Sequence, residues 1–160
     1  MAATDSAPAL LRVALQDLHA GKADQAERLP AIADKCRDPA LVELLRAEAA
    51  NAGAQAAAID GTVDTSGSAN LWMAGILDDA ERDGRQTPPG RLLDIALVGA
   101  IRKGKAAEIV SFETAMALAR AIGTAADLLD LATTQRAAAI ATDRRLAERL
   151  AALAGAAPSG

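Results

Sequence analysis

Alanine and leucine recur at helical spacing along most of this chain. Alanine supplies 43 of the 160 residues, and both residue types are strong helix formers. β-Branched residues are scattered, and the polar–apolar alternation that marks a strand never persists. The sequence therefore predicts an all-α protein, and its length suits one domain with one substantial core.

A shortage of chemically versatile residues excludes several classes of function. The chain has one tryptophan, one phenylalanine, no tyrosine, one histidine (His19) and one cysteine (Cys36). A disulfide framework needs paired cysteines, a Cys/His zinc site needs four such ligands, and single-stranded nucleic acid is bound by stacked aromatic rings. The net charge of −4 offers no basic surface either. We therefore expect neither a nucleic-acid nor a membrane partner.

Targeting signals are also missing from the sequence. The N-terminal residues hold no basic stretch followed by an apolar run, and no run of about 18 uncharged apolar residues occurs. A lone thiol suits a reducing compartment. The expected location is the cytoplasm.

Apolar spacing predicts four long helices and one short helix. Asp38 before Pro39 is typical of a helix start. Gly123 predicts a helix end, followed by Thr124 as the next N-cap with Asp127 at the capping-box position. The predicted helices cover residues 8–36, 39–59, 71–81, 91–122 and 125–154, and residues 82–90 are predicted to form a loop.

The connections between these helices predict the architecture. Short connections join the first helix to the second and the fourth to the fifth, whereas about 30 residues cross between the two pairs. This layout is a ferritin-like four-helix bundle with one long crossover that carries a short fifth helix. The bundle is predicted over residues 8–154, with flexible tails at 1–7 and 155–160. Alanine-rich helices pack closely, so we expect no large ligand cavity.

Polar residues interrupt the middle of each helix's seam, the line of apolar positions that faces the bundle interior. Heptad spacing brings these interruptions to the same level of the bundle. The predicted polar layer consists of Lys22, Gln25, Glu48, Asn51, Gln55, Lys105, Glu108, Gln135 and Asp143.

The two lysines of this layer have three interpretations. Lys22 and Lys105 either extend their ammonium groups to solvent along the seam edge, or pair internally with Glu48, Glu108 or Asp143. The third interpretation, a reactive amine with a lowered pKa, lacks an evident substrate pocket.

A phosphate-loop pattern within the fourth predicted helix also has two interpretations. Residues 99–105 fit G-x-x-x-x-G-K, but Ala106 stands where a Ser or Thr would hold magnesium, and no strand precedes the run. The alternative is that Gly99 and Gly104 let neighbouring helices approach closely.

Four stretches of the chain together match a known pattern: residues 26–30 (AERLP), 38–41 (DPAL), 117–123 (ALARAIG) and 141–146 (ATDRRL). In their order and spacing they resemble the bacterial YciE/YciF family of ferritin-like proteins, and the resemblance covers roughly residues 10–153. The resemblance implies a ferritin-like bundle, commonly dimeric, that is linked to bacterial stress responses and has no well-defined biochemical activity.

The chain departs from the di-metal pattern of ferritin-like bundles. Such bundles hold two metal ions with two single glutamates and two Glu-x-x-His pairs, which a chain with His19 alone cannot supply. Lys22 stands where such family members carry a carboxylate. We therefore expect no metal and no cofactor, and a non-catalytic structural or interaction protein that forms a homodimer. The alternative is a di-iron or di-manganese oxidoreductase, or a metal-binding protein.

Overall fold

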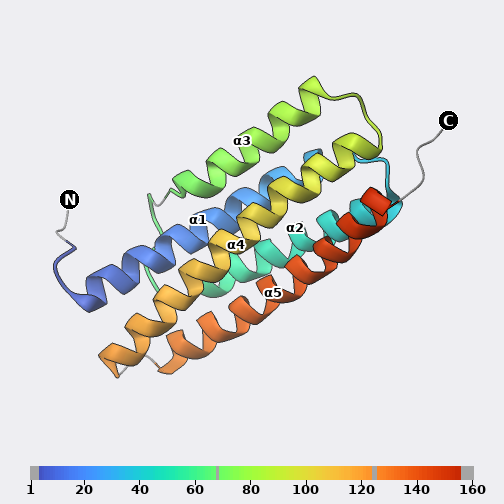
Figure 1. Cartoon of the computed structure of the whole chain (residues 1–160). Coiled ribbons are helices and arrows are strands. Elements are labelled where there is room, and N and C mark those ends of the chain that lie inside the picture. The colour runs from blue at the N-terminus through green and yellow to red at the C-terminus, as the bar shows by residue number, and fades with distance from the viewer. Residues whose placement is uncertain (1–3, 68, 124–125, 156–160) are drawn as a thin grey trace.

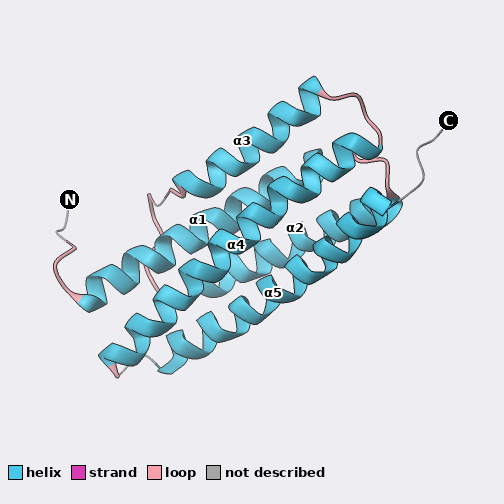
Figure 2. Cartoon of the chain, in the orientation of Figure 1, coloured by secondary structure: helices cyan, strands magenta, loops and turns pink. Residues whose placement is uncertain are grey.

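Five α-helices make up the chain, in a computed structural model that describes residues 4–67, 69–123 and 126–155 (Figure 1). They are α1 (Ala7–Ala33), α2 (Pro39–Asp60), α3 (Leu71–Gln86), α4 (Arg91–Ile122) and α5 (Ala126–Gly155). Figure 2 shows no strand in any of the three described ranges. The predicted fold class is confirmed. None of these helices is long and apolar enough for a membrane span.

The four long helices form the bundle, and α3 is the crossover helix. α1 packs along α2, and α4 packs along α5. Contacts between α1 and α4 and between α2 and α5 join the two pairs. α3 lies on the outside, against the C-terminal half of α1 and the N-terminal half of α4 (Figure 1). A cross-section through one end of the molecule therefore contains five helices, and a cross-section through the other end contains four.

Local sequence signals set several helix ends as predicted. The Asp38 carboxylate accepts a hydrogen bond from the Leu41 amide at 2.9 Å, and Pro39 opens α2. Gly123 ends α4 with φ 75°, a left-handed conformation that favours glycine. The predicted N-cap Thr124 lies outside the described residues, as do residues 1–3 and 156–160 of the predicted tails.

The predicted end of α3 is wrong, because the helix continues past residue 81 to Gln86. Arg82, assigned to a loop, forms ion pairs with Asp79 one turn earlier and with Asp83. The pair with Asp79, three residues apart, supports the helix at this point, and the helix continues even though the next turn contains Gly84. The helix ends at Thr87, whose extended backbone is the conformation preferred before a proline.

The first helix also ends earlier than predicted, at Ala33 rather than Cys36. The buried Asp94 carboxylate of α4 accepts the backbone N–H groups of Arg37 at 3.0 Å and Asp38 at 2.9 Å. This contact ties the α1–α2 turn to α4. Burial, helped by the nearby Asp94 and Asp38 carboxylates, raises the pKa of the Cys36 thiol to about 12. A thiol with so high a pKa is a packing group rather than a nucleophile.

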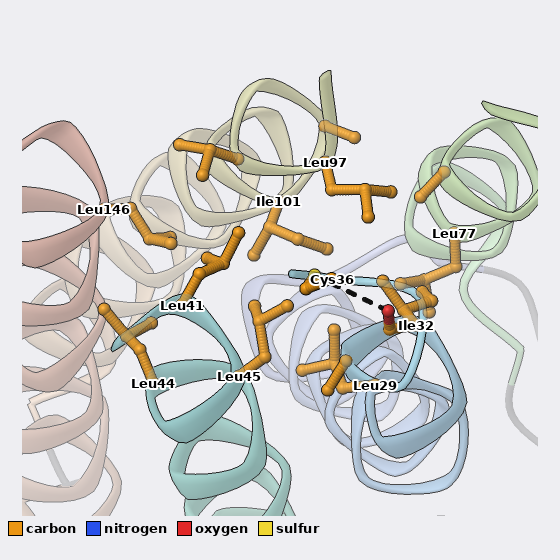
Figure 3. Close-up of a cluster of buried hydrophobic side chains, with 14 of the residues drawn as sticks. Leu29, Ile32, Cys36, Leu41, Leu44, Leu45, Leu77, Leu97, Ile101 and Leu146 are labelled. Carbon is orange, nitrogen blue, oxygen red and sulfur yellow. Dashed lines mark hydrogen bonds between the residues drawn. The ribbon is translucent and has the colours of Figure 1, made fainter. Parts of the chain in front are cut away.

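Two hydrophobic clusters fill the interior. The larger draws side chains from all five helices and includes Leu29, Leu45, Leu77, Ile101 and Leu146 (Figure 3). The smaller draws on the four long helices and includes Leu11, Leu15, Leu18, Ile59 and Phe112. Along α1 and α4, the polar middle of each seam lies between these two clusters.

The phosphate-loop interpretation is wrong, because residues 99–105 lie inside the continuous helix α4. Gly104 does allow close approach, since an added Cβ would lie 3.2 Å from the Met73 Cε of α3. Gly99 has no atom within 4 Å of such a Cβ, so close packing does not explain this glycine.

Gly21 of α1 has the opposite surroundings to Gly99. A Cβ at Gly21 would lie 2.7 Å from the Nδ2 of Asn70. Asn70 accepts the Met73 amide through Oδ1 at 2.8 Å and donates to the Asp17 carbonyl at 2.7 Å. The missing side chain of Gly21 therefore lets one residue cap α3 and attach it to α1.

We expect Gly21→Ala and Gly99→Ala to change stability in opposite directions. Gly99→Ala should raise the free energy of unfolding by about 0.5–1 kcal/mol, because alanine restricts the unfolded chain and fits the open space. Gly21→Ala should lower it, because the methyl group displaces the Asn70 cap. Urea denaturation of both variants measures the two effects. A Gly21→Ala protein as stable as Gly99→Ala would contradict this account of the α3 attachment.

Candidate functional site

Five of the predicted polar-layer residues meet at the bundle centre, and we call these five the central cluster. They are Lys22 and Gln25 of α1, Glu48 of α2, and Lys105 and Glu108 of α4, each no more than 4% exposed. Their spacing of three residues within α1 and within α4 puts both members of each pair on one helix face. Heptad register then brings the three helices' polar positions to one level, as the sequence predicted.

Lys105 is the most highly connected residue of the central cluster. Its ammonium donates to the Gln25 Oε1 at 2.8 Å, to the Glu108 Oε2 at 3.1 Å and to the Glu48 carboxylate. An ammonium has three protons, and all three are used. With 0% exposure, this side chain depends entirely on protein partners.

Glu108 is held between both lysines. Its Oε2 accepts from Lys22 at 2.9 Å as well as from Lys105, and its Oε1 accepts from the Gln25 amide. Lys22 also lies over the Phe112 ring, 5.8 Å from its centroid, a position in which the ring face attracts a cation. The two lysines and two glutamates of the central cluster sum to zero charge.

Thr142 completes the cluster and was missed as a site residue. It donates through Oγ1 to the Glu48 Oε2 at 2.9 Å, which leaves both oxygens of that carboxylate bonded. The available signal was its place on the seam of α5, the one long helix of the bundle that contributes no charge to the central cluster. A hydroxyl on a seam that faces a buried carboxylate is a natural partner.

Mutual attraction outweighs burial for two of the charged groups. Burial favours the neutral forms, but Lys105 and Lys22 lower the pKa of Glu108 below its ordinary value. Burial similarly opposes the charge on Lys105, yet Glu108 and Glu48 raise its pKa. For Lys22, burial dominates and its pKa is lowered, with Lys105 acting in the same direction against the attraction of Glu108.

The other four predicted residues lie outside the cluster. Asn51 is exposed and Asp143 is partly exposed, where it forms an ion pair with Arg102 at 2.7 Å. Each is one position from a true seam residue, a rotation of about 100° around the helix. Gln135 is buried but donates to the backbone carbonyl of the half-buried Gln55 at 3.0 Å. The Oε1 atoms of these two glutamines have no hydrogen-bond partner in the structure.

The structure decides between the interpretations of the two lysines. Lys22 and Lys105 are 1% and 0% exposed, so neither extends its amine to solvent. Internal ion pairing is confirmed, with Glu48 and Glu108 as partners and Asp143 excluded. His19, by contrast, is half-buried beside the seam, and its buried Nδ1 has no hydrogen-bond partner among the described residues.

The central cluster does not fit the metal centre that a ferritin-like bundle implies. Its two carboxylates already bind ammonium groups, whose positive charges would repel a metal ion. Across the described ranges, no group of three or more His, Cys, Asp or Glu side chains is placed to hold a metal. The donor set can stabilise a fold, but it is too small for a di-metal site.

We expect a charge-balanced double variant to be more stable than one of its parents. Lys22→Met leaves Glu108 and Glu48 with one lysine and should cost about 3 kcal/mol or more, because a buried charge loses its partner. Adding Glu108→Gln restores neutrality and should recover part of this loss. Chemical denaturation measures both variants.

A surface ion pair provides the matched control. Arg136 bonds to Glu113 at 2.7 Å at a partly exposed position, so Arg136→Met should cost less than about 1 kcal/mol. A Lys22→Met loss as small as this control would show that the central charges are not coupled.

Acid should weaken the central cluster. Because the folded pKa of Glu108 is lowered, its contribution is present above the ordinary value of 4.5 and is lost as the pH falls through the folded pKa. The stability difference between the native chain and Lys22→Met/Glu108→Gln should therefore shrink below pH 4.5. Urea unfolding across an acid pH series measures it, and a constant difference would contradict the assigned pKa.

Solved structures confirm the fold. The crystal structure of the stress protein YciF of E. coli matches 96% of this chain and 99% of its own, with a TM-score of 0.90 and 19% identity. YcfI of Rhodopseudomonas palustris, described as a candidate structural protein, matches 91% of this chain and 97% of its own, with a TM-score of 0.84 and 20% identity. At these identities the likeness establishes the ferritin-like bundle and no more.

Sequence comparison gives the family. No curated protein matches the chain, but the model of a domain of unknown function, DUF892, matches residues 7–157. The earlier resemblance to YciE/YciF proteins agrees with both findings. Since the match covers nearly the whole sequence, the chain belongs to the DUF892 family.

Proposed function

We propose that this protein is a metal-independent, non-catalytic member of its family, with a structural or interaction role in bacterial stress. One observation carries the proposal: the ammonium groups of Lys22 and Lys105 neutralise the carboxylates at the bundle centre. In a di-metal bundle, the metal ions balance the charge of the carboxylates. Here the chain supplies that balance itself.

Burial of the cluster argues against catalysis at the bundle centre. Glu48, Lys105 and Glu108 are no more than 4% exposed, and each hydrogen-bonds to other residues of the protein. A general base or nucleophile must reach a substrate, and these groups contact only other buried or partly buried side chains of the bundle. The di-metal oxidoreductase alternative therefore has no supporting observation in the described residues.

Resemblance to named proteins supports the stress-related part of the proposal. One structural neighbour is named as a stress protein and the other is described as a structural protein candidate. Neither description includes an enzymatic activity. We further propose a homodimer, supported by large apolar side chains left in solvent, such as Leu71 at 85% and Val110 at 62% exposure.

Elemental analysis of the purified protein, produced with iron and manganese in the medium, tests the proposal. We expect no stoichiometric metal, and a melting temperature that neither a chelator nor added Fe²⁺ or Mn²⁺ shifts. About two metal ions per chain, or loss of stability on chelation, would overturn it. Light scattering on the same sample tests the dimer, since a mass of one chain would exclude it.

A further inference from the structure

A small cavity lies outside the four-helix interior, where α3 rests on α1 and α4. It has a volume of about 220 Å³ and an almost wholly apolar lining. Ile32 of α1, Ala80 of α3 and Leu97 of α4 form its buried floor. Figure 3 shows Ile32, Leu77 and Leu97 in this part of the larger hydrophobic cluster, where α3 meets α1 and α4.

The sequence of α3 explains why this cavity exists. The face of α3 that packs on the bundle carries Met73, Leu77, Ala80 and Gly84, spaced four, three and four residues apart. The side chains shrink along this series from methionine to none. A Cβ at Gly84 would meet only the Lys35 Cγ, at 3.6 Å. Space therefore opens towards the C-terminal end of α3.

Two cations stand at the mouth of the cavity. Lys35 and Arg85 both line it and are exposed, and neither forms an ion pair or side-chain hydrogen bond with any described residue. Glu81 also lines the cavity, but its carboxylate binds Arg28 at 2.8 Å. Among the charged residues that line the cavity, Lys35 and Arg85 are thus the two without an ion-pair partner in the described ranges.

We propose that this cavity binds a short alkyl carboxylate, with the alkyl tail on the apolar floor and the carboxylate between Lys35 and Arg85. The apolar floor favours a hydrocarbon chain, because burying it removes apolar surface from water. The cations favour an anionic head group, which arginine binds particularly well. The small volume limits the tail to a short chain. None of these residues belongs to the central cluster, so the inference does not depend on the proposed function.

Calorimetric titration of the full chain with octanoate, octanol and octylamine, below their aggregation concentrations, tests the proposal. We expect saturable binding of octanoate, binding of octanol weaker by about five-fold or more, and the weakest binding for octylamine. Amide NMR shifts should map octanoate to Gly84 and Leu97. Absence of saturable octanoate binding, or octylamine binding as tight as octanoate, would overturn the proposal.

Two leucine substitutions in α3 locate the binding. Gly84→Leu fills the cavity and should abolish octanoate binding, while the better helix former keeps the chain folded. Gly75→Leu is the matched control, because Gly75 is an exposed glycine of the same helix with no atom within 4 Å of an added Cβ. It should bind octanoate like the native chain. Equal binding by both variants would exclude this cavity.

A charge-removing variant tests the head-group contact. Lys35→Gln/Arg85→Gln should weaken octanoate binding by about five-fold and leave octanol binding unchanged. The same double change at two distant exposed arginines, Arg12 and Arg144, should leave both unchanged. A loss of octanoate affinity in this control as large as at the cavity would mean that net charge, and not the cavity mouth, governs binding.

Discussion

The ammonium group of Lys105 is the contact on which the arrangement of the bundle depends. Its three hydrogen bonds reach α1 and α2 as well as its own helix α4, and Thr142 extends the network to α5. Alanine and leucine seams alone specify helix register weakly, because one apolar heptad resembles the next. A slip of α1 by one heptad would put Leu15 or Leu29 in the place of Lys22 and leave a buried carboxylate short of a partner. The charges therefore select one register among several that the apolar residues would accept.

We infer that this choice of register is what the buried charges contribute to the fold. A buried ion pair contributes little net stability compared with apolar side chains of the same size, since desolvation offsets the attraction. Its effect is on specificity, because any other helix register would leave a buried charge without its partner and so be less stable. Most of the central cluster meets the necessary condition, because each carboxylate oxygen and each proton of the Lys105 ammonium has a partner. Lys22 is held by one hydrogen bond to Glu108 and by the Phe112 ring. A half-satisfied network would destabilise the intended fold together with its competitors.

The sequence predicted the architecture well because helix spacing and helix-end residues are local signals. Gly123 and the Asp38-Pro39 pair act within one turn, and they mark helix ends where expected. The loop prediction at Arg82 was wrong because the packing of α3 on the bundle through Ala80 and the Arg82–Asp79 pair support the helix, despite the low helix propensity of Gly84. Such a balance depends on neighbours that propensity alone does not weigh.

The central cluster was only partly predictable for a related reason. Heptad positions located Lys22, Gln25, Glu48, Lys105 and Glu108 correctly, since periodicity fixes which face a residue occupies. Asn51 and Asp143 were misplaced because a shift of one residue along a helix turns the side chain by about 100°, which is enough to move it from the interior to the surface. Thr142 was missed because its bond to Glu48 depends on how α5 is rotated about its own axis relative to α2, and that rotation cannot be derived from a single sequence. The cavity beneath α3 likewise follows from how the crossover helix docks.

The crossover helix also makes the two ends of the molecule differ in how much apolar surface each one buries. At one end, α3 covers the larger cluster, and the Asp94 carboxylate of α4 accepts hydrogen bonds from the backbone of the α1–α2 turn. At the other end, α3 does not cover the smaller cluster, and the start of α1 lies beside the end of α4 and the start of α5. Local opening costs least where fewer apolar side chains are buried. We therefore expect local opening to begin at the four-helix end, on the far side of the central cluster from α3.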